Sequence, residues 1–415
     1  MRGPGAAAVS LAALISGAAQ SQTSGYFLDR MPTIKGASFT PTGINDSGYI
    51  VGDASTGSLV TPQLVKNGIP QALKGLGGNY AIVNNWLTVS AVSNSGAAAG
   101  TGYNASSLYR AVYWDTSGTP WELVPPQSLP DNVNQYDFRY TTAVDIDEHG
   151  DTVGIAGCNG DDICPVIWHG GYTSGAVGLA KVFIPDGPPE LETPTAISRN
   201  GEWVAGYALP DRSSGFAEIW HNGIPSIVAS YADGYGVNDS GTMVGDMGVG
   251  PDTCPNNPFA IECLTYVAAM WGPHSVKLAL LPGTTTSVAR AINNSNIVVG
   301  TNGGHAVKWD TAGRVTDLSK LMAAQLPSGT VLADALKITD GGKILVEAAT
   351  SSGGSQYSNS LRPSRIRSRF PRTSIQRATG SRSIWSRASF PRKRLPYRRG
   401  MCSGTTMGSC WVRRD

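Results

Sequence analysis

The chain repeats one arrangement of apolar and polar positions roughly every 50 residues. In the stretch INDSGYIVG, which begins at Ile44, an apolar strand ends in a β-branched residue, polar turn residues follow, and a Gly leads into a second apolar strand. This pattern predicts a β-hairpin, because a residue that tolerates positive φ closes a tight turn. The seven copies begin at Ile44, Val92, Ile146, Ile197, Val237, Ile292 and Ile338.

One position of each turn is predicted to adopt positive φ. It is Gly in six copies and Asn in the seventh, and Asn is the other residue that tolerates the left-handed region. The positions are Gly48, Gly96, Gly150, Gly201, Gly241, Asn296 and Gly342. A second Gly ends most hairpins, where we expect a close approach of another backbone segment. Ala205 and Val346 take its place in two copies.

A further apolar strand that ends in Trp follows five of the hairpins. The tryptophans are Trp114, Trp168, Trp220, Trp271 and Trp309, and Val65 holds the equivalent place in the first unit. A turn and a fourth apolar strand come next, so each unit is predicted to hold four short antiparallel strands. That content is typical of a propeller blade, whereas a β-solenoid coil needs only about 20–30 residues.

We therefore predict an all-β chain in which residues 22–360 form one β-propeller of seven four-stranded blades, with six or eight blades as the alternative. The hairpins should supply the two inner strands of each blade, and each Trp should pack between neighbouring blades. Residues 25–31 form an apolar strand without a partner nearby in sequence. We expect it to be the outermost or next-to-outermost strand of the blade that begins near Ile338, because a ring closed by both termini leaves no exposed edge.

The hairpins and Trp strands resemble the HAF-repeat family of extracellular, propeller-like repeat proteins, whose units carry an IN-x-x-G-x-VVG hairpin followed by an H-A-F-x-W strand. The resemblance covers residues 25–357. His305-Ala306-Val307 comes closest to the namesake triplet, Ala111 keeps only its Ala, and Pro165 replaces it in another unit. The resemblance implies an extracytoplasmic repeat protein, and it supplies no catalytic residues.

Charge is distributed unevenly along the chain. Residues 361–415 hold 15 of the 32 basic residues but one of the 30 acidic residues, so 17 basic and 29 acidic residues precede them. The acidic body argues against nucleic acid as the partner of the folded domain. The basic segment 361–415 fits no repeat, and two interpretations stay open: a disordered arm that binds polyanions, or a translated frameshift that replaced the end of the seventh blade.

Residues 1–21 are predicted to be a secretory signal peptide, with Arg2 before an Ala-rich apolar stretch and small residues at the cleavage position; an Ala-rich start without that role is the alternative. The protein is accordingly expected to be extracellular, periplasmic or on the outer surface, and no transmembrane segment is predicted. Disulfides are expected within two loops, Cys158–Cys164 and Cys254–Cys263, because each pair lies at the same place of its own unit. Their spacing does not favour a zinc site.

No catalytic motif, cofactor motif or metal site is evident in the sequence. Asp46, Asp147, Asp239 and Asp340 recur as turn positions, which favours a role in the turn over a unique acid–base site. The leading prediction is a monomeric, non-catalytic binding or structural scaffold whose ligand, an extracellular polysaccharide or protein, contacts insertions such as residues 125–140, 180–194 and 248–264. The alternative is an extracytoplasmic propeller enzyme such as a polysaccharide hydrolase or lyase.

Overall fold

The computed structural model describes residues 11–17, 26–31, 34, 36–57, 59–77, 87–126, 136–158, 162–172, 175–182, 191–209, 215–250 and 264–350. All of them belong to one compact unit, Met1–Ser355. The basic segment 361–415 and the pair Cys254 and Cys263 lie outside the described residues. Among the residues described, no helix has the length and apolar character that a membrane span requires.

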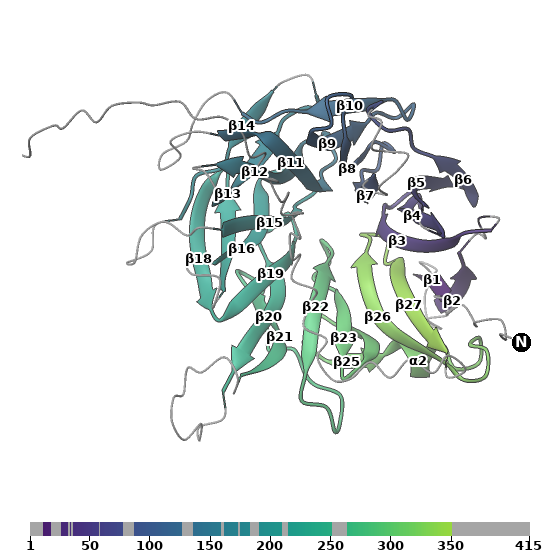
Figure 1. Cartoon of the computed structure of the whole chain (residues 1–415). Helices are drawn as coiled ribbons and strands as arrows, with labels where there is room; N and C mark the ends of the chain where they lie inside the picture. The colour runs from purple at the N-terminus through teal and green to yellow at the C-terminus, as the bar shows by residue number, and fades with distance from the viewer. Residues whose placement is uncertain are drawn as a thin grey trace, which may run out of the picture. The chain divides into compact units, whose positions relative to one another are not determined.

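In the described residues, the antiparallel strands form seven groups around a central axis, which are the blades of a β-propeller (Figure 1). Single parallel bridges, Tyr109–Tyr140 and Ile163–Leu191, join blades 2, 3 and 4 into one 12-stranded sheet. The blades are numbered here in chain order, and strands are given from the axis outward. Blade 1 holds β3 (Ser38–Ile44), β4 (Ile50–Thr56), β5 (Leu59–Lys66) and β6 (Ile69–Ala72). Blade 2 holds β7 (Thr88–Val92), β8 (Ala98–Tyr103), β9 (Tyr109–Trp114) and β10 (Pro120–Leu123). Blade 3 holds β11 (Tyr136–Ile146), β12 (Thr152–Cys158), β13 (Asp162–Trp168) and β14 (Ala176–Gly178).

Blade 4 holds β15 (Leu191–Ile197), β16 (Trp203–Leu209), β17 (Phe216–His221) and β18 (Ile224–Ser230). Blade 5 holds β19 (Ala232–Val237), β20 (Met243–Val249) and β21 (Thr265–Trp271) within the described residues. Blade 6 holds β22 (Ser287–Ile292), β23 (Val298–Asn302), β24 (His305–Trp309) and β25 (Val315–Asp317), after which Asp317 caps the short helix α2 (Leu318–Leu321).

Blade 7 is built from both ends of the folded unit. Its strands are β26 (Thr330–Ile338), β27 (Ile344–Thr350), β1 (Leu11–Gly17) and β2 (Tyr26–Arg30), in that order from the axis. Residues 25–31 were predicted to supply the outermost or next-to-outermost strand of the last blade, and this is confirmed, because β2 is the outermost strand. The third strand, β1, lies within the predicted signal peptide and pairs with both β27 and β2. A cut after Ser21 would remove it from the sheet.

The seven turn positions predicted to need positive φ all adopt it. Their φ angles range from 57° at Asn296 to 91° at Gly96. Neighbouring blades cover several of these turns, since the ring of Trp203 lies over Gly241 and that of Tyr49 over Gly96. A side chain at these glycines would therefore be strained by φ, and at Gly241 it would also meet the neighbouring blade.

Each innermost strand contains a β-bulge at an equivalent place, as between Pro41 and Gly43 or between Ala143 and Asp145, and β11 and β26 carry a second register shift. The bulge presses a carbonyl against the second strand, so that a Cβ at Gly154 would lie 1.9 Å from the carbonyl oxygen of Thr142. This close approach explains why a second Gly ends most of the hairpins. One detail of the sequence analysis was wrong: Gly206, not Ala205, holds this position in blade 4, because the turn there is one residue longer.

The tryptophans pack between neighbouring blades, as predicted, and each bonds the blade before its own. Trp114 is fully buried, and its Nε1 donates a hydrogen bond to the carbonyl of Lys74 at 2.7 Å, just past the outer strand of blade 1. The same bond joins Trp168 to Val124, Trp220 to Ala180 and Trp309 to Ala279. Trp271 is the exception and stays half-buried. Blade 4 runs directly into blade 5 through Tyr231, so no connecting segment covers the Trp271 ring.

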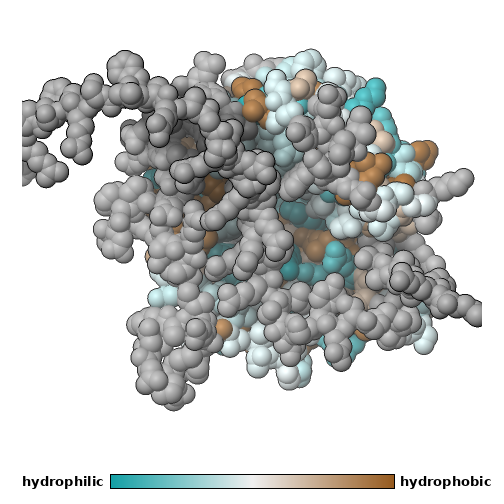
Figure 2. Space-filling model, in the orientation of Figure 1, coloured by the Kyte–Doolittle hydropathy of each residue, from teal (hydrophilic) through white to brown (hydrophobic). Residues whose placement is uncertain are grey.

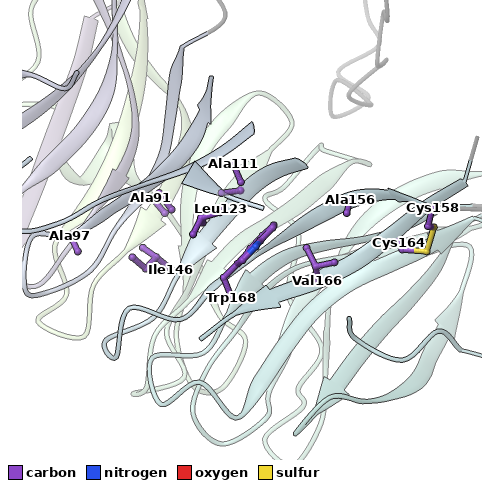
Figure 3. Close-up of a cluster of buried hydrophobic side chains, with 12 residues drawn as sticks. Ala91, Ala97, Ala111, Leu123, Ile146, Ala156, Cys158, Cys164, Val166 and Trp168 are labelled. Carbon is purple, nitrogen blue, oxygen red and sulfur yellow. A yellow bond between two sulfur atoms is a disulfide. The ribbon is translucent and has the colours of Figure 1, made fainter. Parts of the chain in front are cut away.

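Apolar side chains fill the spaces between adjacent blades, and Figure 3 shows the cluster between blades 2 and 3. Cys158 and Cys164 lie at one end of it, both fully buried and joined by a disulfide, as predicted. The bond links β12 to β13 within blade 3. It therefore does not connect neighbouring blades, which are held together by apolar contacts.

Candidate functional site: the axial ring and cavity

Seven turn residues, one from each hairpin, surround the axis at one end of the propeller. We call this set the axial ring; its members are Asp46, Asn94, Glu148, Arg199, Asp239, Asn294 and Asp340. Each of them is the second residue after the innermost strand of its blade, following the first turn residue. Their side chains point away from their own blade, in most cases toward a neighbouring one.

Hydrogen bonds join each ring member to the next blade. The backbone N–H of Asp46 donates to Asn94 Oδ1 at 2.8 Å, and that of Asn94 donates to Glu148 Oε2 at 3.1 Å. The circle closes where the N–H of Gly341, in blade 7, donates to Asp46 Oδ1 at 3.2 Å. Side-chain oxygens at this turn position are therefore used to bond successive blades.

The same bonds run through blades 5 to 7. The N–H of Asp239 donates to Asn294 Oδ1 at 2.9 Å, and the N–H of Asn294 donates to Asp340 Oδ1 at 2.7 Å. Blade 4 is different because Arg199 has no side-chain acceptor. There the backbone carbonyl of Arg199 accepts the bond from the N–H of Glu148, at 3.2 Å.

The side chain of Arg199 instead crosses the axis. Its Nη1 lies 2.6 Å from Asp46 Oδ2 in blade 1 and 3.0 Å from Glu148 Oε1 in blade 3, and its Nε lies 3.2 Å from Asp340 Oδ2 in blade 7. Three carboxylates from three blades thus share one guanidinium. The arrangement places Arg199 over the opening of the axis at this end.

Arg199 also sets the ionisation of the ring. Burial alone would raise the pKa of Asp46, but the Arg199 charge and the hydrogen bonds from Gly341 and Asn94 outweigh it and lower that pKa. For Glu148 burial dominates, and its pKa is raised despite Arg199. The ring holds four acidic residues, of which Asp46, Glu148 and Asp340 contact the guanidinium, and one basic residue, Arg199, so the ring itself is acidic overall.

Beneath the ring lies an axial cavity of about 100 Å³, lined by Glu148 and Arg199 at the ring and by the innermost strands, among them Asp145, Tyr235 and Lys337. Figure 2 shows hydrophilic and hydrophobic side chains together at the centre of the molecule. The cavity is small, because the bulged innermost strands bring backbone close to the axis. It has room for water and for a small group of a larger ligand.

A second group of ionisable residues lies deeper, between blades 5, 6 and 7, and we call it the lower axial cluster; it comprises Asp233, Tyr235, Asp246, Arg290, Asp334 and Glu347. The Tyr235 hydroxyl donates to Asp233 Oδ2 at 3.3 Å, and Arg290 Nη2 lies 2.9 Å from Asp334 Oδ2. Asp246 is 1% exposed and its Oδ1 has no hydrogen-bond partner among the described residues.

Burial, reinforced by the Asp233 charge, raises the pKa of Asp246 to about 8, so this carboxyl is largely protonated at neutral pH. Burial likewise raises the pKa of Glu347. This cluster was not predicted from the sequence. The available signal was an acidic residue directly after the close-approach position of an apolar strand, as in Gly245-Asp246 and Gly52-Asp53, and as at Glu347, where Val346 replaces the glycine.

Different turns and connections surround the two ends of the axis. Because the strands of a blade alternate in direction, the turns after the first and third strands lie at the ring end, where the N–H of Gly171 donates to the carbonyl of Gly150. Connections between blades, and turns after the second strand, lie at the opposite end. The described ends of the predicted insertions 125–140, 180–194 and 248–264 belong to connections of these kinds and so lie at the opposite end, which we call the loop end. The rest of these insertions, residues 127–135, 183–190 and 251–263, lies outside the described residues.

The structure brings together three of the four turn aspartates, namely Asp46, Asp239 and Asp340. Asp147 is not a ring member. It stands one position earlier, is buried, and accepts bonds from the N–H groups of His149 and Asp151 in its own turn at 2.9 and 2.7 Å. Glu148 takes the ring position instead. No group of three or more His, Cys, Asp or Glu residues in the described part of the chain is arranged to hold a metal ion.

No protein-family model matches the sequence, and the search of curated proteins found no match. Solved structures do resemble it. TolB from Acinetobacter baumannii is 10% identical with a TM-score of 0.37, over 82% of this chain and 64% of that one. A putative TolB from Agrobacterium tumefaciens is 10% identical with a TM-score of 0.42, over 83% and 99% of the two chains. The β-propeller domain of the Trilobed protease from Pyrococcus furiosus is 9% identical with a TM-score of 0.45, over 77% and 91%. At these identities the similarity concerns the fold alone.

Proposed function

We propose that this chain is a non-catalytic, extracytoplasmic binding propeller of the HAF-repeat type that engages its ligand at the loop end. The observation that carries the proposal is the asymmetry of the axis. At the ring end, Arg199 crosses the opening and binds carboxylates from three blades. At the loop end, the long insertions are attached to a rigid scaffold, which is where binding residues concentrate in such folds.

The hydrogen bonding of the ring favours a structural role for its acids. Asp46 accepts a bond from Gly341 N–H and pairs with Arg199, and Asp340 accepts from Asn294 N–H and also pairs with Arg199. A general acid or base must be free to exchange a proton with a substrate. Carboxylates that hold adjacent blades together are poorly placed for that task.

The nature of the ligand follows from charge and compartment. The buried Cys158–Cys164 disulfide favours an oxidising compartment. The body of the chain carries an excess of acidic residues, which disfavours strongly anionic ligands. Neutral or cationic polysaccharides and basic protein surfaces are therefore the classes we expect to bind.

The test is a binding and turnover screen with the secreted protein against neutral, cationic and anionic polysaccharides. A variant in which residues 251–263 are replaced by a short Gly-Ser linker should lose binding. Trp121→Ala should retain it, because Trp121 follows the turn between β9 and β10 at the ring end, where its ring stacks on Tyr172. Saturable binding without product release supports the proposal. Turnover, or binding that survives the loop replacement and is lost in Trp121→Ala, contradicts it.

A second candidate function is a propeller enzyme whose site is the lower axial cluster. Asp246, protonated at neutral pH, lies near Asp233 and next to Arg290, so an acid, a base and a cation meet close to the axis. This is the convergence that a hydrolase or lyase would need. Released product that disappears in Asp246→Asn, with folding retained, would favour the enzyme over the scaffold.

A further inference from the structure

Two glutamates are buried at the junction between blades 3 and 4, in positions where the equivalent residues of the blades compared below are not acidic. Glu218 pairs with Gly206, and the residues that pair with the equivalent glycine are Val112, Val166 and Val307 in blades 2, 3 and 6 and Gln63 in blade 1. Glu192 pairs with Ala208, and the equivalent residues are Phe39 in blade 1, Thr141 in blade 3 and Ser287 in blade 6. We call Glu192 and Glu218 the junction acid pair.

The pair is more deeply buried than any turn carboxylate. Both residues have 0% exposure. Glu192 Oε1 accepts a hydrogen bond from the N–H of Val182 at 2.8 Å. Glu192 Oε2 and both carboxylate oxygens of Glu218 have no partner among the described residues. An ionised carboxylate left in that state costs several kcal/mol, so a neutral, protonated form is strongly favoured.

The charged groups acting on the pair are few. Burial raises the pKa of Glu192 to about 8, against a smaller opposing effect of the Val182 N–H and of Lys181. Burial and then the neighbouring Glu192 raise the pKa of Glu218 well above its usual value, again against Lys181. Lys181 itself is 5% exposed and precedes Val182 on the segment between β14 and β15.

That segment is what attaches blade 4 to blade 3. The carbonyl of Ala180 accepts the indole N–H of Trp220 at 2.9 Å, and Val182 packs with Ala208 and Phe216. The acid pair therefore lies against three successive residues that anchor the connection leading into one of the loop-end insertions.

We propose that the junction acid pair is a proton-operated switch: protonated, it holds residues 180–182 in the blade 3–4 junction, and on ionisation it loosens that segment. The linkage sign follows from the raised pKa values. Such groups contribute stability that is fully present below the ordinary glutamate pKa of 4.5 and is lost as pH rises through about 8. Each proton bound only by the folded state changes the unfolding equilibrium constant about tenfold per pH unit.

The test combines thermal melts from pH 5 to pH 9 with hydrogen exchange of residues 176–182 in the full chain. Wild type should lose stability with rising pH more steeply than Glu218→Gln and Glu218→Val, which remove one titrating group; Val restores the residue of blades 2, 3 and 6. Exchange in residues 176–182, taken as the ratio of wild type to Glu218→Gln to cancel intrinsic base catalysis, should rise several-fold between pH 6 and pH 9.

Asp246→Asn is the matched control, because it removes a buried acid of raised pKa from a different junction. Asp246→Asn should make the melting temperature depend less steeply on pH, without changing hydrogen exchange in residues 176–182. A pH profile of Glu218→Gln identical to that of wild type, or an exchange ratio independent of pH, would overturn the proposal. If Glu218→Val does not fold, the Gln variant and the wild-type exchange profile still decide it.

Discussion

The guanidinium of Arg199 lies 2.6 Å from the carboxylate of Asp46, although 153 residues of sequence separate them. The contact spans the propeller axis from blade 4 to blade 1. It also marks the one place where the ring departs from its repeat, because the other six blades place an Asp, Asn or Glu there. A single basic residue among seven equivalent turns thus organises the acidic end of the axis.

Removing this guanidinium should destabilise the ring. Arg199→Ala leaves Asp46, Glu148 and Asp340 near one another without a counter-charge, and since Arg199 is about one-quarter exposed the expected loss is about 1–2 kcal/mol. Chemical denaturation at low salt measures it. Arg314→Ala, which breaks a much more exposed pair with Asp310, should lower the free energy of unfolding by clearly less than Arg199→Ala does, because solvent screens that pair. Equal losses of unfolding free energy in the two variants would show that the Arg199 contacts stabilise the protein no more than an exposed ion pair does.

The same variant should change the acid limb of the stability profile. The lowered pKa of Asp46 contributes stability above its ordinary value of 3.8, which is lost as pH falls through the lowered folded value. In Arg199→Ala the Asp46 pKa should rise, and this contribution should shrink. NMR titration of the carboxyl groups reports the shift directly; an unchanged Asp46 pKa would contradict the assigned cause.

Substitution of an interblade tryptophan should cost more stability where the ring is fully buried than where it is half-buried. Trp114→Phe removes the bond to Lys74 and leaves a space in a fully buried site, so we expect a loss of about 1–3 kcal/mol. Trp271→Phe is the matched control, because that ring is half-buried, and its effect should be below about 1 kcal/mol. Urea unfolding measures both losses. Comparable losses at the two sites would show that burial of the ring against the preceding blade does not determine its contribution to stability.

The two kinds of glycine in the hairpin should respond differently to Ala. At Gly154 a Cβ would meet the Thr142 carbonyl oxygen at 1.9 Å, and backbone must move, at a cost of roughly 3 kcal/mol. At Gly342 there is open space but φ is +77°, so Gly342→Ala should cost about 1 kcal/mol. Thermal melts of the two variants measure the difference. A smaller loss at Gly154 than at Gly342 would be inconsistent with the bulge geometry.

These glycines show why much of the fold was predictable from sequence. Positive φ at Gly48 or Asn296 and close approach at Gly154 are features of local backbone geometry. Such features restrict the residue type at that one position, so they can be read directly from the sequence. Val346 marks the limit of such reasoning. It occupies a close-approach position despite its side chain, and β26 carries an additional register shift between Leu332 and Asp334 that the pattern did not reveal.

The candidate sites were less predictable, because they are made by residues that repeat positions bring together across blades. Nothing near Arg199 in sequence indicates its contacts with Asp46 or Asp340. Likewise, Glu192 and Glu218 belong to β15 and β17, and only the packing of blade 4 against blade 3 shows that both are fully buried with carboxylate oxygens that lack a hydrogen-bond partner among the described residues. In hindsight the recoverable signal was a mismatch within the repeat: Glu218 stands in AEIW where other units have AVYW or AVKW.

Closure of blade 7 supplies the last prediction. Gln325 holds β2 in place, since its Nε2 donates to the Tyr26 carbonyl at 2.8 Å and its Oε1 accepts from Leu28 N–H at 2.8 Å. Deleting residues 22–32 should therefore lower the melting temperature by roughly 10 °C, because β2 also covers part of the core of blade 7. Gln325→Ala, which removes only these two bonds, should lower it by a few degrees.

The measurement should be made on two forms of the chain, because β1 lies inside the predicted signal peptide. If export removes residues 1–21, N-terminal sequencing of the secreted protein should find Gln22, and β2 will have lost the strand that joins it to β27. A synthetic peptide of residues 11–17 should then raise the melting temperature of the processed form and leave that of the full chain unchanged. A mature protein that retains Leu11 would instead make β1 a permanent strand and end the signal-peptide prediction. A melting temperature unaffected by the deletion of residues 22–32 in both forms would show that the two ends of the folded unit do not share a blade.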